Sequence, residues 1–212
     1  MSPTDLSAFN LSLSLAGTTT CLLLLIGTPL AWWLARSQCA IKSIVEAVFT
    51  LPLVLPPTVL GFYLLLAFTG TPFLFSFKGL VVGSCIYSLP FVIQPLQVAF
   101  SSIDKSVLEM ARSMSGSAWH RFWSIIFPLT RRGFLCAGIL SFAHTLGEFG
   151  VVLMIGGNIP GKTELLSITI FNHVEALQYH DANVLSLSLL AFSFVVLVTL
   201  TSFNTRYTRR IL

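Results

Sequence analysis

The feature that most constrains this chain is a series of long, mainly apolar runs without a charged residue. Five such runs are long enough to cross the hydrocarbon core of a bilayer as helices of roughly 20 residues. Only 9% of the 212 residues are charged, against roughly 25% in soluble domains, so too little polar surface remains to cover a soluble globule. The sequence therefore predicts an all-α integral membrane protein, a bundle of five transmembrane helices forming one domain over residues 1–212. The predicted spans are residues 11–35, 47–69, 79–100, 134–156 and 184–203.

The positions of Lys and Arg predict how these spans are oriented. No basic residue precedes the first span, so we expect a span there and not a cleaved signal peptide. The four connections that follow hold two, one, five and one basic residues, and the C-terminal tail holds three. Loops rich in Lys and Arg stay in the cytoplasm. We therefore expect the N-terminus outside the cell, with the C-terminus and residues 104–132 in the cytoplasm.

The longest charged interruption, residues 104–132, predicts two short helices. Ser106 and Glu109 have the spacing of a capping box at a helix start, and apolar residues then recur on one helical face. A second helix is expected from Ala118, with Pro128 bending or ending it. An amphipathic helix here suits either the bilayer surface or a docking site for a soluble protein. The predicted helix ends are Ser115 and Gly116 for the stop and Ser117 for the next cap.

The order of residues in this interruption favours docking. It resembles the EAA cytoplasmic loop of ABC-importer permeases, which runs Glu-Ala-Ala, three residues, Gly, nine residues, Ile, one residue, Leu-Pro. Every spacing agrees, although Met, Ser and Phe replace one Ala, the Gly and the Leu. In that family the loop fits a cleft on a cytoplasmic ATPase subunit and transmits its motion. The residues that carry the resemblance here are Glu109, Met110, Ala111, Ser115, Gly116, Ile125 and Pro128.

The second run, LPLVLPPTVLGFYLLL, is rich in helix-breaking residues. Each proline removes a backbone donor, and hydrocarbon cannot satisfy the carbonyl groups that are freed. Such a break must be covered either by packed neighbouring helices or by a water-filled pathway. The string also resembles the second-span signature of the molybdate and sulfate branch of importer permeases. Its candidate pathway residues are Pro56, Pro57, Thr58 and Gly61.

The fourth run contains the only ionisable residues inside a predicted span, His144 and Glu148. Their spacing of four places them on one face of a continuous helix. A buried carboxyl group is costly in a membrane, so three roles are open: a metal ligand without an evident third partner, a proton relay, or a hydrogen-bonded structural brace. The sequence from Gly147 to Gly150, with the GGNIPGKT that follows, resembles the molybdate-permease form of this span and its exit loop.

The residues after this span predict an outer loop and a surface helix. Gly156 to Thr163 fits the phosphate-loop pattern GxxxxGK[ST], but a soluble strand and a magnesium-holding acid are missing, so we expect no nucleotide site. The loop is instead expected to form the external mouth of a pathway. Apolar residues from Leu165 to Leu177 recur at helical spacing, which suits either a docking site for a substrate-binding protein or an inert interfacial helix.

Several other functions lack support in the sequence. No catalytic constellation, metal-ligand cluster or cofactor loop is evident, so we expect a transport subunit that is not itself an enzyme and carries no cofactor. The formal charge of +4 is explained by topology, and we expect no nucleic-acid binding. The four cysteines have no metal-binding spacing and are expected to be small buried apolar residues.

The resemblance, which covers about Leu51 to Asn183, implies a complete transport system. It implies a permease in the cytoplasmic membrane of a bacterium or archaeon, paired with a second copy around a central pathway and surrounded by membrane lipid. A cytoplasmic ABC ATPase dimer drives it, and a periplasmic or extracellular binding protein delivers a tetrahedral oxyanion. Molybdate is the first candidate, with tungstate, sulfate and thiosulfate as alternatives. The candidate pathway residues are Pro56, Pro57, Thr58, Gly61, Ser84, Gly147, Glu148, Gly150 and Asn158.

Two functions of other classes stay open from the sequence. A proton-coupled secondary carrier would depend on His144 and Glu148. A scaffold without transport would leave the proline-rich second run without a purpose.

Overall fold

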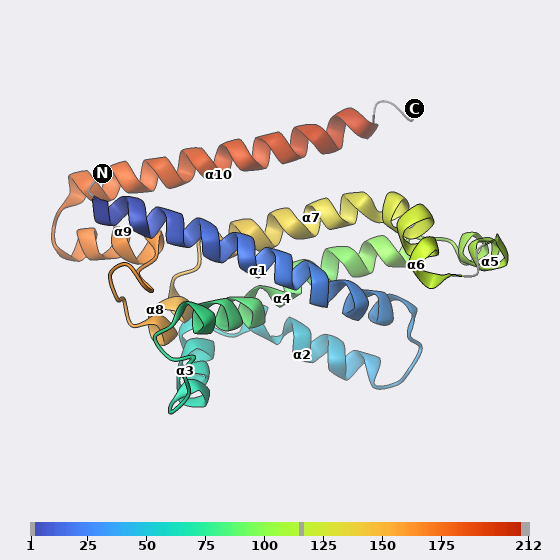
Figure 1. Cartoon of the computed structure of the whole chain (residues 1–212), viewed down its shortest axis with the longest axis horizontal. Coiled ribbons are helices and arrows are strands. Elements are labelled where there is room, and N and C mark those ends of the chain that lie inside the picture. The colour runs from blue at the N-terminus through green and yellow to red at the C-terminus, as the bar shows by residue number, and fades with distance from the viewer. Residues whose placement is uncertain (1–2, 115–116, 209–212) are drawn as a thin grey trace.

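The computed structural model describes the backbone of residues 3–114 and 117–208, and every regular element in these two segments is helical. Three long helices, α1, α4 and α7, pack side by side at the centre (Figure 1). The all-α fold class is confirmed. The helices are α1 (Pro3–Arg36), α2 (Lys42–Val54), α3 (Pro57–Phe68), α4 (Phe77–Ser101), α5 (Lys105–Met114), α6 (Ala118–Arg121), the π-helical turn η1 (Phe122–Ile126), α7 (Phe127–Leu146), α8 (Gly150–Gly156), α9 (Leu166–Glu175) and α10 (Tyr179–Thr208).

Four of these helices in the described part of the chain are long and apolar enough to cross a membrane. They begin at Thr4, Phe77, Ala118 and Tyr179. A fifth crossing exists if α2 and α3, which meet at an angle of 110°, form one broken span. The second predicted run is therefore two helices, interrupted at Leu55 and Pro56.

Small residues allow the central helices to approach closely. A Cβ atom on Gly27 of α1 would lie 2.8 Å from Val92 Cγ1 of α4. A Cβ atom on Gly133 of α7 would lie 2.3 Å from the Ala99 Cβ of α4. Lipid tails are as apolar as leucine, so close packing of this kind, and not burial from water, favours helix association in a bilayer.

Polar groups also connect the three central helices. Ser88 Oγ of α4 lies 2.9 Å from His144 Nδ1 and 3.0 Å from Thr145 Oγ1, both of α7. Arg36 Nη2 at the end of α1 donates to the carbonyl oxygens of Phe100 (2.8 Å) and Ile103 (3.2 Å). These carbonyl groups lie at the C-terminal end of α4, where backbone acceptors lack helical partners. The Arg36 side chain therefore supplies hydrogen-bond donors to the C-terminal end of α4.

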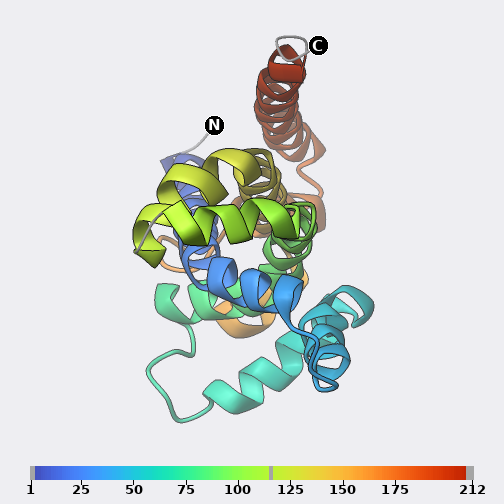
Figure 2. The ribbon, with the colours of Figure 1, turned by 90° about the vertical axis from the view of Figure 1, so that its right-hand side faces the viewer.

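The two ends of the bundle carry different elements. In Figure 1, α5 and α6 lie at one end, together with the last turns of α10, whereas the N-terminus, α8 and α9 lie at the other. Figure 2, seen from the α5 end, shows α10 on one side of the central helices and α2 and α3 on the opposite side. The predicted cytoplasmic segment and the predicted outer loop are thus at opposite ends of one molecule.

The structure tests three predictions about helix ends. Helix α5 begins at Lys105, so Ser106 is already inside the helix and the predicted capping box is wrong. The second helix begins at Ala118 with Ser117 as its N-cap residue, as predicted, but the Ser117 side chain makes no capping hydrogen bond. Pro128 neither ends nor breaks its helix, because the Phe127 N–H donates to Phe122 O in a π-helical turn just before it, and α7 continues. Ser115 and Gly116, the predicted stop, lie outside the described residues.

Two further predictions are wrong. Helix α7 ends at Leu146 and α8 begins at Gly150, so Glu148 lies in a break and does not share a helical face with His144. The predicted run 134–156 is therefore not one helix. Cys21, Cys39 and Cys136 are exposed and not buried in the single chain.

Candidate functional site

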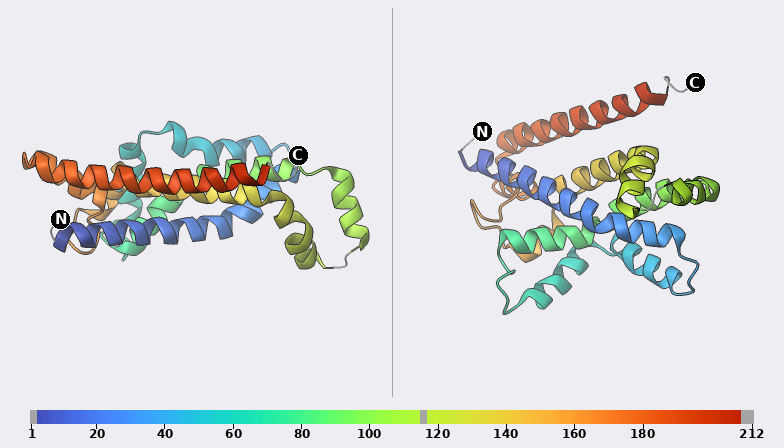
Figure 3. Two further views of the ribbon diagram at one scale, coloured as in Figure 1. Left: turned by 90° about the horizontal axis from the view of Figure 1, so that it is seen from above. Right: turned by 45° about the vertical axis from the view of Figure 1, so that its right-hand side comes forward.

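The predicted docking segment extends from one end of the bundle as an amphipathic helix. Helix α5 lies beyond the ends of the central helices (left panel of Figure 3), and its Glu109 and Met110 are exposed. Ala111 on the opposite face is only 4% exposed and lines a cavity of about 250 Å³ together with Trp32 of α1 and Ile126 of η1. One face of α5 is therefore turned toward the rest of the chain, with Leu108 packed against the core, while the other remains available to a partner.

The break between α2 and α3 lies directly against the break between α7 and α8. A Cβ atom on Gly150 would lie 2.8 Å from Pro57 Cβ and 3.4 Å from the backbone nitrogen of Thr58. A Cβ atom on Gly61, one turn further along α3, would lie 2.9 Å from the Met154 Cβ of α8. The predicted pathway residues of the second and fourth runs are thus brought together, and α3 and α8 pack as one unit.

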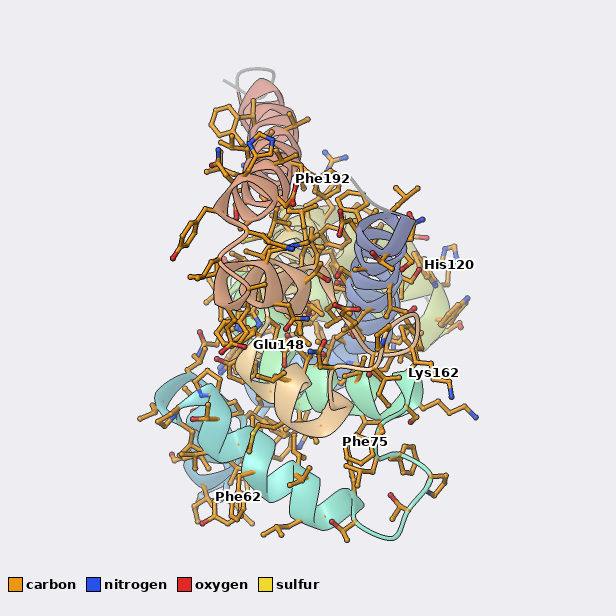
Figure 4. All side chains as sticks on the ribbon, turned by 90° about the vertical axis from the view of Figure 1, so that its left-hand side faces the viewer. Phe62, Phe75, His120, Glu148, Lys162 and Phe192 are labelled. Atoms are coloured by element: carbon orange, nitrogen blue, oxygen red, sulfur yellow. The ribbon has the colours of Figure 1, made fainter. Side chains whose placement is uncertain are left out.

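Glu148 occupies the break itself and is enclosed by the chain. Glu148, labelled in Figure 4, is 4% exposed. Neither of its carboxyl oxygens has a hydrogen-bond partner among the described residues. The Ser84 hydroxyl of α4 is also fully buried and, like the Glu148 carboxyl oxygens, has no hydrogen-bond partner in the described part of the chain. The backbone is held in place, because Ser167 Oγ of α9 donates to Glu148 O over 2.7 Å. The predicted hydrogen-bonded brace is therefore made by the backbone of Glu148 and not by its carboxyl group.

His144 belongs to a different cluster. Its ring stacks on Phe91, with centroids 4.0 Å apart, and Nδ1 contacts Ser88. Ser88 and Thr145 were missed in the sequence, although a serine and a threonine in apolar runs are the signal for polar contacts between membrane helices. No group of three or more potential metal ligands occurs in residues 3–114 and 117–208, so the described side chains show no metal centre.

The loop between α8 and α9, predicted to lie outside, is closed by its own side chains. Thr163, which completes the phosphate-loop pattern, is fully buried. Its Oγ1 donates to Gly156 O (2.6 Å) and accepts from the Ile159 N–H (3.0 Å). Asn158 has the left-handed backbone that asparagine tolerates, with φ 53°, and exchanges side-chain hydrogen bonds with Asn172. The threonine is a structural part of this loop.

Helix α9 contacts both α1 and the α7–α8 break. The Leu166 N–H, at its first residue, donates to Ser12 Oγ of α1 over 2.8 Å. His173 Nδ1 lies 2.8 Å from Gln178 Oε1, and Nε2 lies 3.4 Å from the buried Asp5 carboxylate of α1. The hydrogen bond to Gln178 and the nearby Asp5 raise the pKa of His173, although partial burial opposes them. The predicted surface helix is present, with Leu165 and Ile168 buried and Val174 exposed.

The candidate pathway residues thus divide into two groups. Those next to the α2–α3 break are open on the surface of the single chain, whereas others face its interior. The exposed residues are Pro56, Pro57, Thr58 and Gly147; the buried ones are Gly61, Ser84 and Glu148; Gly150 and Asn158 are half-buried.

Comparison with known proteins gives consistent matches over most of the chain. The family model for the binding-protein-dependent transport system inner membrane component matches residues 27–212. The molybdenum transport system permease protein ModB of Azotobacter vinelandii is 52% identical, covering 95% of both chains. ModB of Haemophilus influenzae is 34% identical over 81% of this chain and 80% of its own. A sulfate transport system permease protein, CysT of Synechocystis, is 32% identical over 82% of this chain and 65% of its own.

Solved structures support the fold. A chain of the MetNI methionine ABC transporter in inward-facing conformations superposes with a TM-score of 0.72, with all of both chains covered. An importer of the polysaccharide alginate superposes with the same TM-score over 100% of this chain and 81% of its own. The identities are 14% and 16%, so these likenesses concern the fold.

Proposed function

The chain belongs to the family of binding-protein-dependent transport system inner membrane components, and on this premise we propose that it is the membrane-spanning subunit of an ATP-driven molybdate importer. The ABC-importer permease class follows from the family and from relatives that share most of the length of the chain. Molybdate follows from the ModB relatives, of which one is 52% identical. The sulfate permease CysT of Synechocystis, at 32% identity, is more distant than this relative.

The observation that carries this proposal is the half-packed helix α5. A helix that transmits motion must contact the permease with one face and leave another face exposed for the ATPase. Ala111 is buried and Glu109 and Met110 are exposed, at the same positions at which the chain resembles the ATPase-coupling loop. We assign the cytoplasmic ABC ATPase to the exposed face of α5. Hydrolysis of ATP then belongs to that partner, while this chain transmits the motion.

The orientation follows from charge. The connection that contains α5 holds five of the twelve Lys and Arg residues, and basic connections remain cytoplasmic. The opposite end, with the N-terminus, α8 and α9, then faces the outside. We assign the oxyanion-binding protein to this outer end, where α9 is bonded both to α1 and to the backbone of Glu148.

The pathway is proposed to lie along the exposed side of the α2–α3 break, closed by a second copy of the chain. Large apolar side chains are exposed there, including Val54 at 80% and Tyr63 at 63%. No Lys or Arg lies between residues 43 and 77, so the break offers an anion no fixed cation. Hydroxyl and backbone N–H donors can solvate a dianion without a fixed cation, and Thr58 supplies such a hydroxyl at the break. Glu148 points into the subunit and not into this route.

The test is ATP-dependent uptake of labelled molybdate by proteoliposomes that contain the permease, its ATPase and its binding protein. Glu109→Lys is expected to abolish uptake and to weaken co-purification of the ATPase, while the permease still inserts. Lys78→Glu, a charge reversal at an exposed position near the opposite end, is the matched control and is expected to transport normally. Unchanged uptake by the Glu109→Lys protein would remove α5 as the coupling element.

The proton-coupled carrier is not favoured. The family matches are binding-protein-dependent permeases. The two ionisable groups that a relay would need also do not form a pair, because His144 of α7 contacts Ser88 of α4, whereas Glu148 lies in the break beyond the end of α7.

A further inference from the structure

The cavity of about 250 Å³ beside the buried face of α5 is not used by the coupling or pathway assignments. Its walls come from three parts of the chain: the end of α1, α5, and the turn formed by α6 and η1. It is larger than the roughly 150 Å³ cavity that can hold a benzene molecule, so a small ligand fits inside. The lining residues that matter for its chemistry are Trp32, Arg112, Ala118, Arg121 and Phe122.

Two arginines from different helices line this cavity. Arg112 belongs to α5, and Arg121 is the last residue of α6. Glu109 has the spacing of an ion-pair partner for Arg112 on one helix, yet no ion pair joins Arg112 to an acid in residues 3–114 and 117–208. The sequence contains no Asp or Glu between Met110 and Gly147. The positive charge of Arg112 is therefore not neutralised within the described part of the chain.

A third arginine, Arg36, adds positive charge next to the cavity. Its guanidinium lies 5.2 Å from the centre of the Trp32 ring, and Trp32 is part of the cavity wall. The charges of Arg36 and Arg112 repel each other. Repulsion between like charges is stronger beside apolar side chains than in bulk water. An anion bound in the cavity would offset this repulsion.

The chemistry of the lining side chains favours an anion with several oxygen atoms. A guanidinium carries five N–H donors in a planar fork, which matches the oxygen atoms of phosphate-like groups. Arg121 has a further interaction within the chain, and five donors allow it to keep this interaction while it binds an anion. The Trp32 and Phe122 side chains contain no hydrogen-bond acceptor, so the acceptors for the arginines must come from a ligand.

We propose that this cavity binds a tetrahedral oxyanion group of the phosphate class between Arg112 of α5 and Arg121 of α6. Free phosphate in solution and the phosphate of an anionic phospholipid headgroup share this chemistry. Because the bound group contacts α5 and α6 together, it connects the proposed coupling helix to the turn that leads into α7. The cytoplasmic location of the site and its link to coupling rest on the proposed function; the binding itself does not.

The test measures binding to the intact permease in phosphatidylcholine nanodiscs, without the ATPase. Inorganic phosphate is titrated at constant ionic strength, with chloride as the balancing ion, and tryptophan fluorescence is recorded because Trp32 lines the cavity. A saturable change is expected. Arg112→Gln is expected to weaken phosphate binding about tenfold, or about 1.4 kcal/mol. Lys105→Gln removes the same charge from the same helix outside the cavity lining, so this matched control is expected to bind phosphate like the unaltered protein.

A second variant keeps both arginines and fills the cavity. Ala118 lines the cavity and is exposed at the start of α6, so a larger side chain there is compatible with the fold. Ala118→Trp is expected to abolish the phosphate response, while its unfolding temperature without phosphate stays that of the unaltered protein. A full phosphate response in Ala118→Trp would place the bound anion outside the cavity and overturn the proposal.

Nanodiscs that contain phosphatidylglycerol distinguish the two sources of the phosphate group. Phosphatidylglycerol that competes with phosphate, and that native mass spectrometry finds on the unaltered protein but not on Arg112→Gln, would assign the site to a headgroup. Phosphate binding that phosphatidylglycerol leaves unchanged would assign it to the free anion. Equal responses of Arg112→Gln and Lys105→Gln, or no binding of either anion, would overturn the proposal. If Arg112→Gln instead loses only the ATPase, the cavity receives an acidic side chain of that partner, which overturns it as well. The binding measurements do not require uptake, so failure of the transport assignment would be seen separately.

Discussion

The Cβ atom that an alanine would place at residue 150 comes within 2.8 Å of Pro57 Cβ, so the first residues of α8 and α3 touch at the meeting point of two broken helices. The proline ring cannot rotate out of the way, and the Thr58 nitrogen is close behind it. A side chain at position 150 must therefore push the two helices apart. This contact makes Gly150 a packing requirement for the α3–α8 unit.

Gly150→Ala is expected to lower the stability of the permease by about 1–3 kcal/mol, the usual range for overpacking. The reduction should appear as a lower unfolding temperature in detergent and as weaker uptake. Gly17→Ala is the matched control, because Gly17 lies within α1 and nothing is within 4 Å of an added Cβ atom. That variant is expected to be neutral or to gain about 0.5–1 kcal/mol. Equal behaviour of the two variants would contradict the role of the contact.

Arg36 gives a second prediction, because it joins the ends of two helices that are far apart in sequence. Its Nη2 atom donates to Phe100 O and Ile103 O, and its guanidinium lies 5.2 Å from the centre of the Trp32 ring. Arg36→Ala is expected to destabilise the protein by about 1.5–3 kcal/mol, the range for a hydrogen bond to a charged group. Arg36→Lys keeps the positive charge but not the planar guanidinium group. It is expected to lower the free energy of unfolding by less than Arg36→Ala does. Denaturation followed by tryptophan fluorescence measures both; a neutral Arg36→Ala would show that the carbonyl groups find other donors.

The long helices were predictable because hydrocarbon forces backbone groups to bond within one segment. Runs without a charge predicted α1, α4 and α10, whose ends extend beyond the predicted spans by only a few residues, except at the N-terminus of α1. Pro128 was not predictable in the same way. Its effect depends on whether the preceding turn widens, and that is decided by how Phe122 and Phe127 pack.

The break in the fourth run shows a second limit. Apolar residues continue on both sides of Glu148, so hydropathy predicts one helix to residue 156. The interruption depends on contacts from distant segments, namely Ser167 on the Glu148 carbonyl and Pro57 on Gly150. The docking role of the residues around Glu109 stays a prediction from their order in the sequence; the structure adds that Glu109 and Met110 are exposed. The apolar groove between α1 and the η1–α7 turn was missed because its two walls, which include Leu25 and Trp123, are about 100 residues apart.

Glu148→Gln separates the favoured function from the proton-coupled alternative. Gln has the same shape, and neither Glu148 oxygen has a hydrogen-bond partner to lose. Uptake is therefore expected to stay within about twofold of the unaltered protein, or ~0.4 kcal/mol in the barrier, and to remain dependent on ATP. Uptake is measured with and without an uncoupler that dissipates the proton gradient. Complete loss of transport, or loss on addition of the uncoupler, would favour a proton relay through this carboxyl group.

The last prediction concerns pH at the outer end of the molecule. His173 faces the Gln178 side chain and the Asp5 carboxylate, with Asp181 of α10 also nearby, and its pKa is raised above the ordinary 6.5. A raised pKa means that the folded protein holds the proton more tightly than the unfolded chain does. The resulting stabilisation is complete below about pH 6.5 and is lost as the pH rises through the folded-state pKa.

The unaltered protein should therefore exceed His173→Gln in unfolding temperature at pH 6, and the difference should shrink by pH 8.5. His180→Gln, at an exposed histidine near the start of α10, is the control and should show no such trend. Because the contact joins α9 to the first turn of α1, the loss at high pH should also increase proteolysis between α9 and α10. A difference that grows with pH would mean that His173 is neutral in the folded protein, and that the contact between α1 and α9 does not depend on its charge.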